Sequence, residues 1–189
     1  MFYSMTYIDG QTLREAMRGA MPEHIAAGYI IQIAKVLHKA HELGLVHADV
    51  SPNNIKVKTT CRTRNFAVLV DWGNANAMDY DDGYGIGTNG YRAPETFRGK
   101  PQADVYSLAA TLLYLLTGRK PVMLDNKECI AKTKQLLAEH NVSIETIEAI
   151  LHAMDIDVEK ATKTIHDFVM ELPKELVIKI LLNYTDNDR

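Results

Sequence analysis

The sequence has few cysteines and no long apolar run, and both scarcities exclude classes of protein. Cys61 and Cys129 are far apart and form no C-x-x-C pair, which excludes a disulfide framework and the usual zinc-site spacings. Free thiols are typical of a reducing compartment, so we expect a cytoplasmic protein. The N-terminus lacks the charged start and apolar stretch of a signal peptide. The most apolar segment, residues 105–116, is too short to span a bilayer and is typical of a buried helix.

A strong excess of charge of one sign is also lacking. The 189 residues contain 21 Lys plus Arg and 24 Asp plus Glu, a formal net charge of −3. No basic excess indicates nucleic acid as a partner, and no polybasic run indicates a membrane surface. Hydrophobic residues make up 47% of the chain, which excludes disorder as its main state. The length fits one domain with a single core.

Periodicity and turn residues predict a mainly helical chain with a few short strands. We expect a strand over the first eight residues, a short helix from Leu13 through Met17, strands at 55–57 and 66–70, and a long loop at 73–100. Longer helices are expected from Pro22 to about Leu43, with Ile25 on its apolar stripe, and at 103–117. Three further helices are expected near the C-terminus: one capped by Ser143, one capped by Asp157 that carries Ala161, and one starting at Pro173.

Four segments carry the chemical signal: HADVSPNNIKV at 47–57, VDWGNA at 70–75, GTNGYRAPE at 87–95 and ADVYSLAATLLYLLTGRKP at 103–121. Each is weak alone, but in this order they resemble the C-terminal lobe of a eukaryotic-type protein kinase of the serine/threonine class. HAD resembles the H-R-D catalytic loop, DWG resembles D-F-G, and RAPE resembles the A-P-E end of the activation segment. The resemblance implies a mainly α (α+β) fold, a helical bundle with a short hinge strand and small β-hairpins.

The resemblance also assigns catalytic roles. Phosphoryl transfer needs in-line positioning and neutralisation of phosphate charge, chiefly by Mg²⁺. Asn54 and Asp71 would bind Mg²⁺ through oxygen, and Asp49 would orient the acceptor hydroxyl and take its proton. Thr88 matches a threonine that bonds the catalytic aspartate. Asp104 matches the aspartate that anchors the backbone of the catalytic loop, and His47 would be a packed core residue.

ATP is the implied nucleotide, and a protein is the implied substrate. Met5 would be the gatekeeper, and the C=O of Thr6 and the N–H of Ile8 would bond adenine. Ser51 stands where the family has a lysine that contacts the γ-phosphate, and Lys56 stands where it places an apolar residue under adenine. Arg189 is either the ion-pair partner of Glu95 or a solvated terminal charge.

The implied domain is one kinase-like C-lobe over residues 1–189. Its parts would be a hinge at 1–10, the catalytic loop at 45–57, the activation segment at 71–95 and divergent helices at 122–189.

Some elements of the family pattern are not found. No V-A-I-K lysine precedes the hinge, and the literal G-x-G-x-x-G at 85–90 follows DWG, so we interpret it as activation-segment glycines. Ala48 replaces the arginine of H-R-D. We therefore expect the chain to lack the N-terminal lobe and to be weakly active or inactive alone.

Two alternatives remain at this stage. A pseudokinase-like or truncated lobe would act as a binding module, with a protein partner or the missing N-lobe covering an apolar hinge face near Met5, Tyr7 and DWG. A small-molecule kinase of the aminoglycoside type shares H-x-D and a metal aspartate, but the segment at 87–95 argues against it. His38 and His41 share a helical face and could bind a metal, although no third ligand is evident.

Overall fold

The computed structural model describes residues 8–59, 65–78 and 87–185. These residues form a mainly helical fold with two small antiparallel sheets, which confirms the predicted fold class. The α-helices are α1 (Leu13–Ala16), α2 (Glu23–Glu42), α3 (Pro101–Thr117), α4 (Lys127–Glu139), α5 (Ile144–Ala153), α6 (Ile165–Glu171) and α7 (Lys174–Thr185). The strands are β1 (Gln11–Thr12), β2 (Leu45–Val46), β3 (Ile55–Thr59), β4 (Asn65–Leu69) and β5 (Asn76–Ala77), and two 3-10 turns are η1 (Trp72–Asn74) and η2 (Glu95–Phe97).

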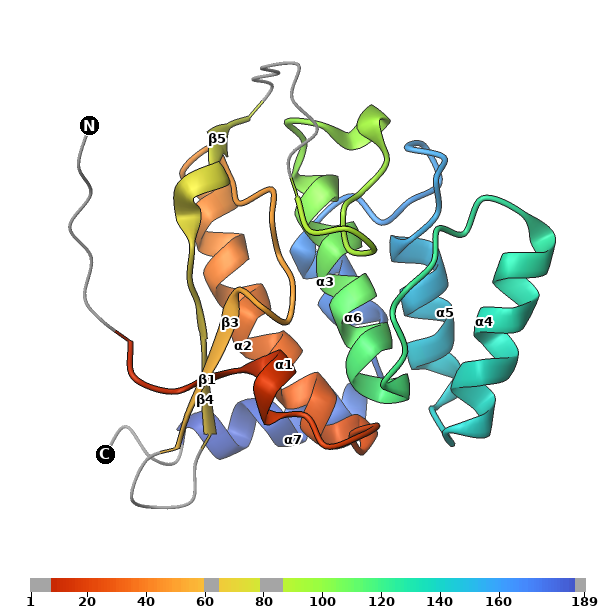
Figure 1. The fold of residues 1–189 in the computed structure, drawn as a ribbon, viewed down its shortest axis with the longest axis horizontal. Coiled ribbons are helices and arrows are strands. Elements are labelled where there is room, and N and C mark those ends of the chain that lie inside the picture. The colour runs from red at the N-terminus through yellow and green to blue at the C-terminus, as the bar shows by residue number, and fades with distance from the viewer. Residues whose placement is uncertain (1–7, 60–64, 79–86, 186–189) are drawn as a thin grey trace.

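Helix α3 runs through the centre of the molecule, with α2 on one side and α5 on the other (Figure 1). It begins with Pro101 in its first turn and ends at Gly118, whose φ of 68° suits glycine at a helix C-terminus. Most of its side chains are buried, as expected for an apolar run without a polar face. Its buried hydroxyls are satisfied locally, since Thr111 Oγ1 donates to the Ser107 carbonyl at 2.8 Å. Within the described residues, no helix is long and apolar enough to cross a membrane.

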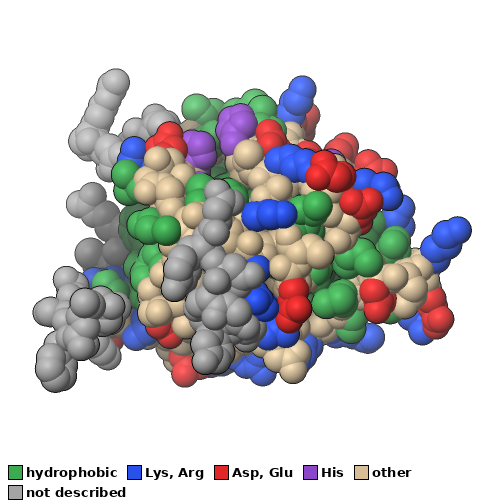
Figure 2. Space-filling view, turned by 90° about the horizontal axis from the view of Figure 1, so that it is seen from above, with side chains coloured by type: hydrophobic (Ala, Val, Ile, Leu, Met, Phe, Trp, Pro, Cys, Tyr) green, Lys and Arg blue, Asp and Glu red, His purple; other side chains and the backbone are tan. Residues whose placement is uncertain are grey.

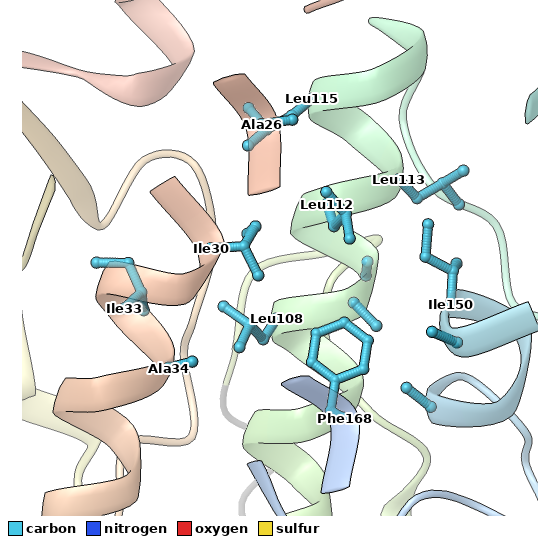
Figure 3. Close-up of a cluster of buried hydrophobic side chains, with 14 of the residues drawn as sticks. Ala26, Ile30, Ile33, Ala34, Leu108, Leu112, Leu113, Leu115, Ile150 and Phe168 are labelled. Carbon is cyan, nitrogen blue, oxygen red and sulfur yellow. The ribbon is translucent and has the colours of Figure 1, made fainter. Parts of the chain in front are cut away.

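The core is formed where α2, α5 and α6 contact α3. Figure 3 shows Ile30 of α2 facing Leu108 and Leu112 of α3, with Ile150 and Phe168 on the other side. All five side chains are fully buried, and each such burial contributes about 1.5–3 kcal/mol to folding.

The predicted helix from Pro22 to Leu43 is confirmed as α2. Ile25 is a correction to its predicted apolar stripe, because its side chain is 43% exposed. It lies on the solvent side of α2, since its neighbour Ala26 is fully buried together with Ile30, Ile33 and Leu37.

The two predicted strands pair as an antiparallel hairpin, β3–β4, with Ile55 opposite Leu69. Strand β1 adds to the other edge of β3, and β2 pairs with β5. The two-residue strands β1, β2 and β5 were not predicted, because such short segments show no alternation. Residues 1–7 of the predicted first strand lie outside the described residues.

Helices α5 and α7 agree with the prediction, whereas α4 was not among the three helices expected and α6 begins elsewhere than predicted. Ser143 caps α5, accepting from the Thr146 amide at 3.3 Å, and α7 begins after Pro173. Asp157 does not cap a helix that carries Ala161, so that prediction was wrong. Its carboxylate instead accepts from the Glu159 amide within a turn, and Thr164 caps α6 by accepting from the Asp167 amide at 3.1 Å.

Candidate active site

The backbone before Asp49 is held by Asp104, in the first turn of α3. Its fully buried carboxylate accepts hydrogen bonds from the amides of His47 and Ala48, at 2.8 and 2.9 Å. His41 Nε2, at the end of α2, lies 2.9 Å from Asp104 Oδ2. The predicted anchoring contact is therefore present. The bond to Ala48 supports an unusual backbone, since Ala48 has φ of 65° in the left-handed region.

His47 lies beneath the loop and is fully buried, as predicted. Burial lowers its pKa, although the nearby Asp104 carboxylate opposes this effect. The hydrogen bonds fit a neutral ring, because Nδ1 accepts from the Asp49 amide at 3.3 Å and Nε2 donates to the Val70 carbonyl at 3.2 Å. The ring also meets Trp72 edge-on, with centroids 4.6 Å apart. His47 therefore links the backbone of Asp49 to Val70, which directly precedes Asp71.

The Asp49 carboxylate is fixed through both of its oxygens. Oδ1 accepts from the amide and the hydroxyl of Thr88, each at 2.7 Å. Oδ2 accepts from the side-chain amides of Asn54 at 3.0 Å and Asn74 at 3.3 Å. The predicted contact between Thr88 and Asp49 is thus present, and it ties the segment around Thr88 to the loop that carries Asp49.

Asn54 and Asp71 lie at the same end of the β3–β4 hairpin. Asn54 directly precedes β3, and its carbonyl accepts from the Val70 amide, just past β4, at 2.8 Å. Its Nδ2 donates to Asp49, so Oδ1 is the side-chain atom able to bind a cation. Asp71 follows Val70, is exposed, and accepts weakly from the Gly73 amide at 3.4 Å. One amide oxygen and one carboxylate are donors that Mg²⁺ prefers.

Sequence reasoning missed two residues of this arrangement. Asn74 reaches Asp49 because η1 turns the chain back after Asp71. His41 reaches Asp104 because α2 ends beside the first turn of α3. Both are polar residues close to a recognised motif, which was the available signal. In the described residues no group of three or more His, Cys, Asp or Glu could hold a metal ion, and His41 is paired with Asp104.

The structure describes only some of the residues predicted to bind the nucleotide. Met5 and Thr6 lie outside the described residues. The Ile8 carbonyl accepts from Lys56 Nζ at 2.8 Å, so these two residues are brought together. Ser51 is fully buried, and its Oγ lies 3.4 Å from the Thr88 hydroxyl.

The two alternatives for Arg189, an ion pair with Glu95 or a solvated terminal charge, cannot be distinguished, since Arg189 lies outside the described residues. Glu95 is largely exposed and meets Arg98, which is only 24% exposed, at 3.4 Å.

The sequence model of the protein kinase domain matches residues 1–188. The chain belongs to the protein kinase family. It is 37% identical over 148 residues to the serine/threonine-protein kinase PknD of Mycobacterium tuberculosis, a match that covers 74% of this chain and 21% of PknD.

Two other bacterial kinases are similar to this kinase chain. The serine/threonine-protein kinase PknB of Mycobacterium leprae is 34% identical over 137 residues, covering 67% of this chain and 21% of PknB. PknL of Mycobacterium tuberculosis is 35% identical over 139 residues, covering 69% of this chain and 34% of PknL. The matched part is thus between about a fifth and a third of each relative's length.

Proposed function

We propose that this kinase domain transfers the γ-phosphate of ATP to a serine or threonine hydroxyl of a protein. One observation carries the proposal: Asp49 and Asn54 share a hydrogen bond at the end of the hairpin whose other strand leads into Asp71. Hydrogen bonding and strand pairing therefore connect the backbone segments that carry Asp49, Asn54 and Asp71. The names of the three bacterial relatives support the serine/threonine class.

Each residue has a role that its contacts support. Asn54 Oδ1 and the exposed Asp71 carboxylate would hold Mg²⁺, which neutralises charge on the phosphate oxygens when bound. Asp49 would orient the acceptor hydroxyl and accept its proton, with Thr88 fixing the rotation of its carboxylate. Ile8 and Lys56 would lie at the adenine side. Ser51, beneath Thr88, would line the γ-phosphate side of the nucleotide site, and Met5 and Thr6 would complete the adenine contacts.

We assign these residues to a C-lobe with a hinge at 1–10, a catalytic loop at 45–57, an activation segment at 71–95 and divergent helices at 122–189. The glycine-rich loop and the lysine that grip the α- and β-phosphates in kinases would come from outside these 189 residues. Without them, and with Ala48 and Ser51 in place of charged residues, we expect weak or no phosphoryl transfer by this chain alone. The free thiol of Cys129 supports a cytoplasmic location.

The test is a thermal-shift titration with ATP, with and without Mg²⁺. We expect a Mg²⁺-dependent rise in Tm that Asp71→Ala abolishes, whereas Asp125→Ala, an exposed change outside the site, keeps it. A wild-type chain with no Mg²⁺-dependent shift, or Asp71→Ala with an unchanged shift, would contradict the proposed metal site. Radiolabelled phosphate incorporation above an Asp49→Asn control would contradict the expected low activity.

A second candidate function, a binding module, is favoured by an apolar surface beside the DWG segment. Val36, Leu43 and Leu45 are 40%, 68% and 39% exposed, and with Trp72 they line a depression of about 480 Å³. Met5 and Tyr7, the other residues predicted for this surface, lie outside the described residues. This function would need no nucleotide, so a chain that shows no shift with Mg²⁺-ATP would favour it.

A further inference from the structure

A groove lies between the C-terminal end of α3, residues 118–122 and α4. Its volume is about 390 Å³. Leu113, Val122 and Leu136 supply an apolar lining, and Val122 is 53% exposed. Such a mixture of exposed apolar surface and convergent polar groups is typical of a binding surface.

The groove adjoins the segment around Gly90, which would contact the substrate residue that accepts the phosphate. Lys120 and Pro121, at its edge, close over Gly90 so tightly that a Cβ on Gly90 would lie 2.6 Å from Lys120 Cε and 3.4 Å from the Pro121 carbonyl oxygen. Gly90 is two residues after Thr88, which bonds Asp49. Lys120 and Pro121 thus bring one edge of the groove against Gly90, two residues from the Thr88 that bonds Asp49.

Positive charge predominates along the groove. Arg119, Lys120 and Lys132 line it and are exposed, against one lining carboxylate, Glu139, which accepts from Gln135 at 2.9 Å. Lys132 also pairs with Glu128, but both side chains are over 70% exposed, so this pair is screened and easily exchanged.

A further cation, Arg14, lies near Tyr91, the residue after Gly90. The Arg14 guanidinium carbon is 6.0 Å from the Tyr114 ring centroid, and Tyr114 contacts Tyr91 edge-on. The Arg14 amide donates to the Pro52 carbonyl in the catalytic loop at 3.1 Å. Arg14 and Lys120 therefore both lie near the 90–91 segment, Arg14 through Tyr114 and Lys120 through Gly90. This local bias contrasts with the face in Figure 2, where basic and acidic side chains of the described residues interleave.

We propose that the α3–α4 groove binds an acidic, leucine-containing segment of the protein substrate. Glutamate or aspartate side chains would pair with Arg119, Lys120 and Lys132, and an aliphatic side chain would pack on Leu113 and Val122. The proposal rests on the proposed function, in that the occupant is a protein substrate. The groove is small, so the affinity is modest and the charges chiefly select the partner.

The test measures binding without nucleotide, using a fluorescein-labelled peptide of alternating Glu and Leu and its Gln-for-Glu counterpart. Fluorescence anisotropy should show binding of the Glu peptide that weakens as salt is raised, and much weaker binding of the Gln peptide. Arg119→Glu combined with Lys132→Glu should weaken Glu-peptide binding about tenfold. Lys134→Glu, on the same helix but outside the groove, should leave it nearly unchanged.

Equal binding of the two peptides, or an equal loss in Lys134→Glu, would overturn the proposal. Circular dichroism and an unchanged Tm show that each variant is folded. The Mg²⁺-ATP thermal shift is recorded on the same samples. If the peptide fails to bind while the thermal shift is retained, only the proposed groove is contradicted. If the shift is lost while the peptide still binds, only the proposed nucleotide site is contradicted.

Discussion

Asp104 Oδ1 accepts a hydrogen bond from the amide of Ala48 at 2.9 Å, and Ala48 is one of three non-glycine residues with positive φ in the described chain. A buried carboxylate on a central helix thus holds a left-handed residue directly before Asp49. Alanine in this conformation is strained by about 1–2 kcal/mol relative to its usual conformations. The strain is tolerated because the Asp104 contacts fix the loop.

Replacing Ala48 with glycine should relieve this strain. We expect Ala48→Gly to raise the free energy of unfolding by about 0.5–1 kcal/mol, since the gain exceeds the extra entropy of an unfolded glycine. The matched control is Ala131→Gly on the exposed face of α4, which should lower it by about 1 kcal/mol. Urea unfolding of both variants checks the opposite signs, and a loss of stability in Ala48→Gly would contradict the strain argument.

Asp104→Asn should destabilise the protein by about 2–3 kcal/mol. Asparagine offers one acceptor oxygen where His47 N, Ala48 N and His41 Nε2 now meet two, so at least one buried donor loses its partner. Denaturant unfolding measures the effect. Glu148→Gln, the same type of change on the exposed face of α5, should change stability by less than about 0.5 kcal/mol.

The buried His47 should make stability depend on pH. Its folded-state pKa is lowered by burial, so below about pH 6.5 the unfolded chain binds a proton that the folded chain does not. Stability is therefore fully present above that pH and decreases as pH falls toward the folded-state pKa. Asp104, Asp49 and Asp71 oppose the shift but are weaker than burial. The decrease is at most about 1.4 kcal/mol per pH unit.

The measurement compares urea unfolding at several pH values for wild type, His47→Gln and the exposed control His24→Gln. His47→Gln should be less stable at neutral pH and lose less stability on acidification. An acid slope unchanged in His47→Gln would show that other groups cause it.

Gly10 and Gly28 should respond oppositely to alanine. A Cβ on Gly10 would lie 2.5 Å from the Val57 carbonyl oxygen of β3, and φ there is 136°, so Gly10→Ala should destabilise by more than about 1 kcal/mol. Gly28, inside α2, has nothing within 4 Å of such a Cβ, so Gly28→Ala should stabilise by about 1 kcal/mol. Thermal unfolding of the two variants decides. Equal shifts in Tm would show that the close approach of Gly10 to β3 is unimportant.

Much of this arrangement could be predicted from local sequence signals. Helical periodicity predicted α2, the long apolar run predicted α3, and the ordered motifs indicated that Asp49, Thr88 and Asp104 contribute to one arrangement. The hairpin between Asn54 and Asp71 followed from two short apolar runs. These features depend on residues close in sequence or on a recognised motif order, which a single sequence displays.

Other features depend on contacts between distant segments. His41 and Asp104 are 63 residues apart, and only the packing of α2 on α3 brings them together. Asp157 and Thr164 are both residue types that commonly cap helices. Which of them caps α6 depends on where Ala161 packs into the core. The groove between α3 and α4 is a property of two helix surfaces, so no motif indicated it.

Because α3 is buried, we expect the loop before Asp49 to open only slowly. The amides of His47 and Ala48 donate to Asp104, whose helix forms the centre of the core. Solvent can reach these two amides only when that carboxylate separates from them. Their hydrogen exchange should therefore be nearly as slow as that of the α3 amides, although they belong to a loop. The segment next to Asp49 thus has the rigidity of the core.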